Sequence, residues 1–177
     1  MPIHFLREYK SAPLYHGTDY HSAYLILQTN MLKANTSNET ETHGVSFTRN
    51  KNEWYYKFVF VVDQAKLANN HKVAPVYRHG IAGRDLAEER VPYDIRNLNK
   101  LLIEVDVRGD TNLRIIRKKL LKMTPENLVT LPSNSILQSY HYLYLAIKLA
   151  IKNRIKLGKN LLKVKAMYEE ILSAKFN

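Results

Sequence analysis

The pattern of apolar and polar positions predicts one helix near the start of the chain. In residues 19–32 (DYHSAYLILQTNML) apolar side chains recur at helical spacing, and Thr18 or Asp19 can cap the first turn. Residues 33–43 (KANTSNETETH) hold no apolar run and are rich in turn-forming residues. We therefore expect an exposed loop after the helix.

Four short stretches in the following part of the chain predict strands. They lie at 44–50 (GVSFTRN), 58–62 (FVFVV), 87–91 (AEERV) and 101–107 (LLIEVDV). Pro92 ends the third run, because proline cannot donate to a strand ladder. Residues 63–70 fit a short helix, and the histidines, prolines and glycines of 71–85 predict an irregular loop.

After about Asp110 the pattern becomes helical and basic. Residues 111–123 (TNLRIIRKKLLKM) are amphipathic, and 135–176 predict one or two long helices with a break near Gly158. The strands do not alternate with helices, which argues against a doubly wound parallel sheet. We predict an α+β protein with a strand-rich core over 1–110 and a basic helical section over 111–177, packed on or beside that core.

Positive charge is concentrated in the helical section. The chain has 177 residues, with 27 Lys and Arg against 16 Asp and Glu, a net charge of +11. Residues 1–113 hold 14 cations and 13 anions, whereas residues 114–177 hold 13 and 3. A net +1 followed by a net +10 predicts an acidic partner for the C-terminal section, with nucleic acid as the first candidate. Lysine-rich helices that only keep a protein in solution would have the same composition.

The composition also narrows the kind of site. A hydrophobic content of 45% is enough for a buried core, and no run of about 18 apolar residues predicts a membrane span. The chain has no cysteine, which excludes disulfides and thiolate metal sites, and its seven histidines show no metal-binding spacing. The first ten residues lack the apolar core of a signal peptide. We expect a cytoplasmic protein with neither a metal nor a membrane partner.

Three stretches occur in an order that resembles the ADP-ribosyltransferase family. LYHGT (14–18) precedes the predicted helix, GVSFTRN lies on a strand, and AEERV lies on a later strand. Toxin-like and polymerase-like members carry an aromatic-His-Gly-Thr/Ser element before a helix, then a Ser/Tyr-x-Thr strand, then a glutamate strand. AEERVP is also similar to a stretch of the DarT-type enzymes that modify DNA. The resemblance covers about residues 13–107.

The resemblance implies a split antiparallel β-sheet with a cleft that binds NAD as co-substrate. The reaction would break the bond between nicotinamide and ribose through a transition state similar to an oxocarbenium ion. It needs a carboxylate near the anomeric carbon and a clamp that orients the NAD. The acceptor of the ADP-ribose would be a macromolecule, either protein or nucleic acid. A phage or intracellular bacterial effector, acting in the host cytoplasm, would suit such a chain.

The resemblance also assigns roles in binding NAD. The residues concerned are Tyr15, His16, Gly17, Thr18, Ser46, Thr48, Arg49, Tyr55 and Tyr56. His16 would hydrogen-bond a ribose hydroxyl, and Gly17 would let the backbone approach the nicotinamide amide. Tyr55 or Tyr56 would stack on nicotinamide. Arg49 would meet an NAD phosphate, or it would serve as a surface ion-pair partner.

A carboxylate on the third strand would carry the chemistry. Glu88 is the expected catalytic residue and Glu89 is its rival, because only one of two neighbouring side chains on a strand faces a cleft. Ser46 or Thr48 would hold that carboxylate in place. Together with His16 these residues make a mixed His-Ser-Glu set.

The match departs from the main branches of the family. Position 86 is Leu, so the arrangement of arginine-modifying members is absent, and Ser46 stands where polymerase-like members have tyrosine. The acceptor is therefore not inherited from one branch.

Two alternative functions stay open. One is an NAD-consuming RNA 2′-phosphotransferase, although Arg49 is the only arginine in residues 14–50. The other is a basic nucleic-acid-binding protein without catalysis.

Overall fold

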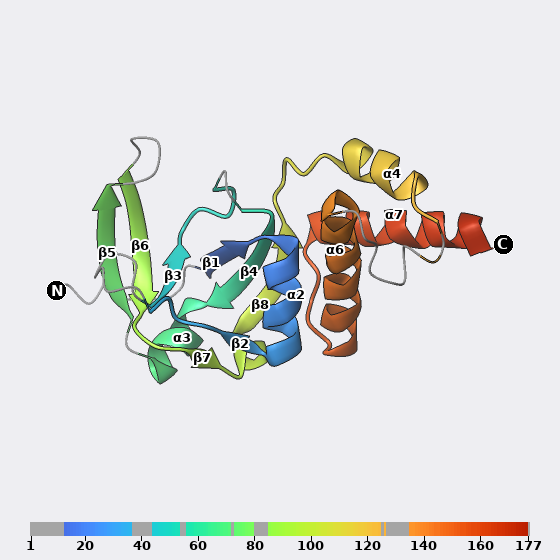
Figure 1. The fold of residues 1–177 in the computed structure, drawn as a ribbon. Helices are drawn as coiled ribbons and strands as arrows, with labels where there is room; N and C mark the ends of the chain where they lie inside the picture. The colour runs from blue at the N-terminus through green and yellow to red at the C-terminus, as the bar shows by residue number, and fades with distance from the viewer. Residues whose placement is uncertain are drawn as a thin grey trace.

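The protein combines an antiparallel sheet with helices (Figure 1). The computed structural model describes residues 13–36, 44–53, 56–71, 73–79, 85–124, 126 and 135–176. The predicted α+β class is confirmed, since the strands pair antiparallel and the longer helices gather in the C-terminal part.

Six strands form the main sheet in the order β5-β6-β3-β1-β4-β8, and each neighbouring pair is antiparallel. The strands are β1 Pro13–Thr18, β3 Val45–Thr48, β4 Phe58–Asp63, β5 Ala74–His79, β6 Asp85–Val91 and β8 Leu102–Val107. Two short strands, β2 (Met31–Leu32) and β7 (Ile95–Arg96), pair in a separate ribbon. A 3-10 turn at Leu98–Lys100 leads into β8.

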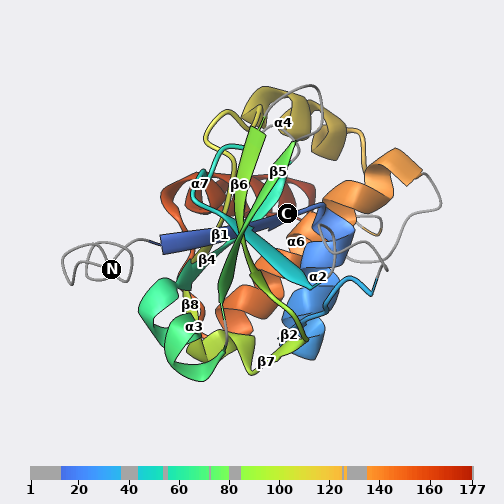
Figure 2. The same ribbon diagram turned by 90° about the vertical axis from the view of Figure 1, so that its left-hand side faces the viewer.

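The main sheet narrows between β1 and β3. β1 pairs with β4 along its whole length, but it pairs with β3 at one register position, Tyr15 opposite Thr48. Two three-stranded halves, β5-β6-β3 and β1-β4-β8, therefore meet at a single residue pair. Figure 2 shows β5 and β6 running across the direction of β1.

The first helix begins as the sequence predicts and ends earlier. α2 spans Tyr20–Thr29, and the Asp19 side chain caps it by accepting a hydrogen bond from the Ser22 amide at 2.7 Å. The prediction that the helix extends to Leu32 is wrong. Asn30 adopts a left-handed conformation with φ of 54°, which ends the helix and directs the chain into β2.

The loop predicted over 71–85 is wrong for seven of its residues, six in β5 and Asp85 at the start of β6. Ala74–His79 form β5, which pairs with β6 from Ala74 opposite Arg90 to His79 opposite Asp85. β5 is the edge strand of the sheet, where a proline is tolerated because one side of the strand needs no donor. The short helix predicted before it is confirmed as α3, Gln64–Asn70.

The described residues of the basic section include the helices α4 Leu113–Leu121, α6 Ser135–Lys152 and α7 Lys159–Phe176. The break predicted near Gly158 is confirmed between α6 and α7. α6 packs along α2 (Figure 1), and buried side chains such as Leu143 and Val164 belong to the same hydrophobic cluster as Phe47 and Phe60 of the sheet. Within the described part of the chain, no helix has the length and apolarity needed to cross a bilayer.

A buried carboxylate ties the start of α7 to β8. Asp106 is fully buried, and its Oδ1 accepts a hydrogen bond from the Leu161 amide at 2.8 Å. Its Oδ2 forms an ion pair with Lys51. A Cβ on Gly158 would collide with this carboxylate, so the residue at the break between the helices must be glycine or the carboxylate must move. The Asp106 carboxylate thus positions α7 on the sheet.

Candidate functional site

β1 holds His16 beside β3. Its Nδ1 lies 2.9 Å from the Ser46 carbonyl oxygen, and because a carbonyl only accepts, Nδ1 carries the proton. The ring meets the Phe47 ring edge-on, with 5.9 Å between centroids. Burial lowers the pKa of His16 and outweighs the hydrogen bond to Ser46, which acts in the opposite direction. The imidazole is therefore neutral at pH 7, with Nε2 as an acceptor.

His16 lines a cavity of about 270 Å³ at the edge of β3. The polar side chains around it are His16, Lys33, Asn35, Ser46 and Arg90. Arg90 is only 6% exposed. The described lining contains two cations, Lys33 and Arg90, and no carboxylate.

A glycine shapes the rim of this cavity. The backbones of Asn35 and Gly44 exchange two hydrogen bonds, of 2.9 and 2.8 Å. Gly44 has φ of 96°, and a Cβ there would collide with the Val91 carbonyl. Both the backbone conformation and the space require glycine at the start of β3.

The register of β6, β3 and β1 places the two candidate glutamates in neighbouring rows of the sheet, and only the row of Glu89 passes through Phe47, which contacts His16. Glu88 lies opposite Thr48, which lies opposite Tyr15, so these three residues share one row across three strands. Glu89 lies opposite Phe47, whose ring touches His16. The side chain of Glu88 is outside the described part of the structure.

Glu89 has a buried carboxylate with two partners. Arg49 donates to its Oε1 from Nε at 2.8 Å and from a terminal nitrogen at 2.6 Å. Gln64 Nε2 lies 3.4 Å from Oε2. Of the two expected roles of Arg49, the ion pair is the one the structure contains; contact with an NAD phosphate stays a prediction. Gln64 was missed at the level of sequence, where a polar residue directly after FVFVVD was the available signal.

The two hydroxyl residues on β3 have different contacts. Thr48 Oγ1 lies 3.1 Å from both the Asn50 carbonyl and the Tyr56 hydroxyl. Since the carbonyl only accepts, Thr48 donates to Asn50 and Tyr56 donates to Thr48. Ser46 contributes its backbone carbonyl to His16. The expected contact of Ser46 or Thr48 with a catalytic carboxylate stays a prediction.

Tyr56 explains the glycine after His16. Its ring packs against Gly17 so closely that a Cβ on Gly17 would collide with ring carbons. Tyr56 is 4% exposed and packs against a small cluster that includes Tyr15. Thr18 ends β1, and its carbonyl accepts a hydrogen bond from the Lys57 amide at 3.2 Å. Tyr55 lies outside the described residues.

We expect Gly17→Ala to displace Tyr56 and break its contact with Thr48. Overpacking of this kind costs about 1–3 kcal/mol, so the melting temperature should fall by about 3–10 °C. Gly109→Ala is the matched control, because a Cβ there would meet only Asn52 and Asn160 atoms, at 3.7 and 3.8 Å. Thermal unfolding followed by circular dichroism measures both, and equal melting temperatures would contradict the role given to Gly17.

Comparisons with known proteins assign no family. No protein-family model, curated protein sequence or solved structure matches the chain. In the part of the chain that the structure describes, no group of three or more His, Asp or Glu side chains could hold a metal ion. The function is therefore argued from the residues of the site.

Proposed function

We propose that the protein is an NAD-dependent mono-ADP-ribosyltransferase. The observation that carries the proposal is the convergence of three distant stretches: LYHGT, GVSFTRN and AEERV contribute β1, β3 and β6, which are neighbours in the sheet. These are the stretches that resemble the family. Their convergence supports a common site, with the cation-lined cavity beside His16.

The cavity and His16 would bind the NAD. Nε2 of the neutral His16 would accept a hydrogen bond from a ribose hydroxyl, and Lys33 and Arg90 would attract the diphosphate. The sheet holds His16 through Ser46, so the ring is oriented before the ligand arrives.

Glu88 would be the carboxylate that stabilises the ribose cation. Both oxygens of Glu89 have protein partners, Arg49 and Gln64, which supports a positioning role for Glu89. The bond between ribose C1′ and the nicotinamide nitrogen would break, with its electron pair passing to the nicotinamide ring. A heteroatom of the acceptor would then bond to C1′ and lose its proton to a base.

Labelled NAD tests the proposal. The protein is incubated with NAD labelled in its adenylate half, alone and with protein lysate, single-stranded DNA or RNA. We expect release of nicotinamide above the protein-free background and transfer of label to one acceptor class. The release should be constant at neutral pH and fall at pH values below about 6.5, because a protonated His16 no longer accepts a hydrogen bond. Absence of both NAD binding and nicotinamide release would contradict the proposal.

A further inference from the structure

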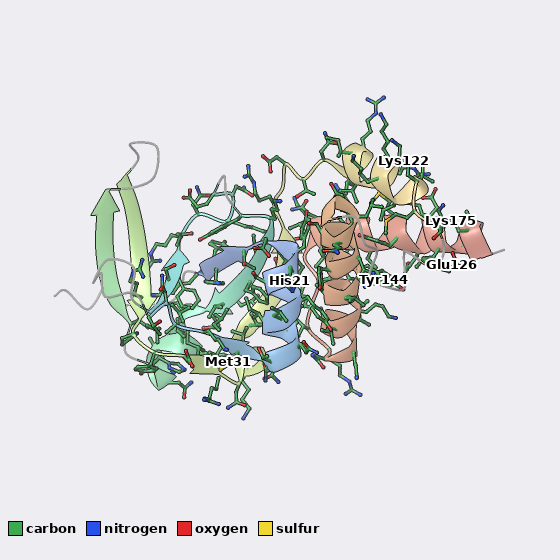
Figure 3. The ribbon with its side chains drawn as sticks, viewed as in Figure 1. His21, Met31, Lys122, Glu126, Tyr144 and Lys175 are labelled. Carbon is green, nitrogen blue, oxygen red and sulfur yellow. The ribbon has the colours of Figure 1, made fainter. Side chains whose placement is uncertain are left out.

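One side of α4 is a row of exposed cations. Arg114, Lys118 and Lys122 are spaced four residues apart, so they lie along one face of the helix and its C-cap, and all three are exposed. We call these three residues the α4 basic face. Figure 3 labels Lys122 at the outer edge of the helical section. The stretch from Asn112 to Thr124 contains no acidic residue.

The opposite side of α4 is held firmly by α7. Ile116, Leu120 and Met123 are buried in the core. Arg117 pairs with Glu170 of α7 at 2.7 Å, and Lys175 donates to the Leu121 carbonyl at 3.1 Å. The main apolar side of the helix is therefore already covered. This side of α4 is not available to a lipid surface, although Ile115 and Leu121 of the same helix are exposed.

A groove lies between α4 and Tyr56, beside the candidate site. It has a volume of about 340 Å³ and includes Asn112 and Ile115 of α4. Its other walls carry aromatic and cationic residues: Tyr20, Tyr56, Tyr140, Lys57 and Arg108. Asp110 also lines it and is paired with Arg108 at 2.8 Å. Tyr56 is also the residue that packs on Gly17, so one wall of the groove contacts the strand that carries His16.

We infer that the α4 basic face binds the phosphate backbone of single-stranded nucleic acid and directs the strand into this groove. Regularly spaced cations complement a polyanion. Tyr140, the groove tyrosine that is not buried, offers a ring beside these cations on which an unpaired base can stack. A duplex does not present free base faces to such a groove. The binding is independent of the chemistry at His16; the role of the strand as acceptor of ADP-ribose rests on the proposed function.

Charge reversal tests the inference. The triple variant Arg114→Glu, Lys118→Glu, Lys122→Glu is compared with a matched reversal of Lys152, Arg154 and Lys156, which are exposed in the turn at the end of α6 away from α4 (Figures 1 and 2). Fluorescence anisotropy with a labelled single-stranded oligonucleotide, its duplex and phosphatidylserine vesicles measures binding. The Gln versions of the α4 variant repeat the test if the Glu versions fail to fold.

We expect the α4 variant to weaken single-strand binding at least about tenfold near 0.1 M salt, and to reduce the slope of log K against log salt by about 2, since three phosphate contacts are lost. The control variant should lose much less. Equal losses in both variants would overturn the inference, as would tighter binding to the duplex or to vesicles.

Nicotinamide release without nucleic acid separates this inference from the proposed function. The α4 variant should keep the wild-type rate, because its substitutions lie outside the cavity beside His16. A wild-type protein that binds the oligonucleotide through α4 but does not consume NAD would leave the inference standing and remove the enzymatic proposal.

Discussion

Glu88→Gln is expected to lower nicotinamide release from NAD by at least about a hundredfold, while NAD binding changes little. Loss of one group that stabilises transition-state charge typically costs two to three orders of magnitude in rate. The amide keeps the shape of the carboxylate but cannot stabilise a developing ribose cation. Release of nicotinamide under saturating NAD measures the rate, and isothermal calorimetry measures the binding.

Glu89→Gln is the matched control, one residue along the same strand. We expect its rate to stay within a few-fold of wild type. Its stability should fall by about 1–2 kcal/mol, because the amide no longer compensates the charge of Arg49; the value is modest because the Arg49 side chain is 38% exposed. The opposite pattern of rates would transfer the catalytic role to Glu89. Full activity in both variants would remove the carboxylate assignment.

Asp106→Ala should destabilise the protein by about 3 kcal/mol or more, the largest effect on stability that we expect from any single substitution discussed above. The substitution leaves Lys51 without its buried partner and deprives the Leu161 amide of its acceptor. Removal of one member of a buried ion pair typically costs 3–5 kcal/mol. Urea unfolding measures the change.

Glu104→Ala tests whether the loss of stability expected for Asp106→Ala comes from the burial of the Asp106 carboxylate. Glu104 lies two residues away on β8 and also faces Lys51, but at 3.8 Å and with 21% of its side chain exposed. Its loss should cost less than about 1 kcal/mol, as for most exposed pairs. Similar losses for the two variants would show that Asp106 does not anchor α7 in the way its contacts suggest.

Local patterns were sufficient for elements whose burial is periodic. The start of α2 follows from Asp19 and the spacing after it, and β4 follows from the continuous apolar run over 58–62. β5 was missed because its residues match a loop, and it becomes a strand through pairing with β6. The early end of α2 depends on the left-handed backbone conformation of Asn30. Asparagine adopts this conformation at some positions only, so the residue type alone does not predict it.

In the candidate site, too, local sequence identified some residues, and the tertiary structure alone showed their contacts. A motif of a few letters indicated His16 and Gly17, but the contacts that hold them come from Ser46 and Tyr56, about thirty to forty residues away. The rivalry between the two glutamates also has no answer in the sequence. The choice between them becomes testable because the structure shows the Glu89 carboxylate in contact with Arg49 and Gln64.

The amino-acid order alone determined where the helices and four of the strands, β3, β4, β6 and β8, begin, to within a few residues. It also determined that the positive charge gathers behind residue 113. These properties depend on neighbours along the chain, through periodic burial, capping and composition. Only the tertiary structure decided that β6, β3 and β1 are adjacent and that Asp106 anchors α7. Such contacts depend on strand order and on the exclusion of water from a shared core, and no local pattern encodes either.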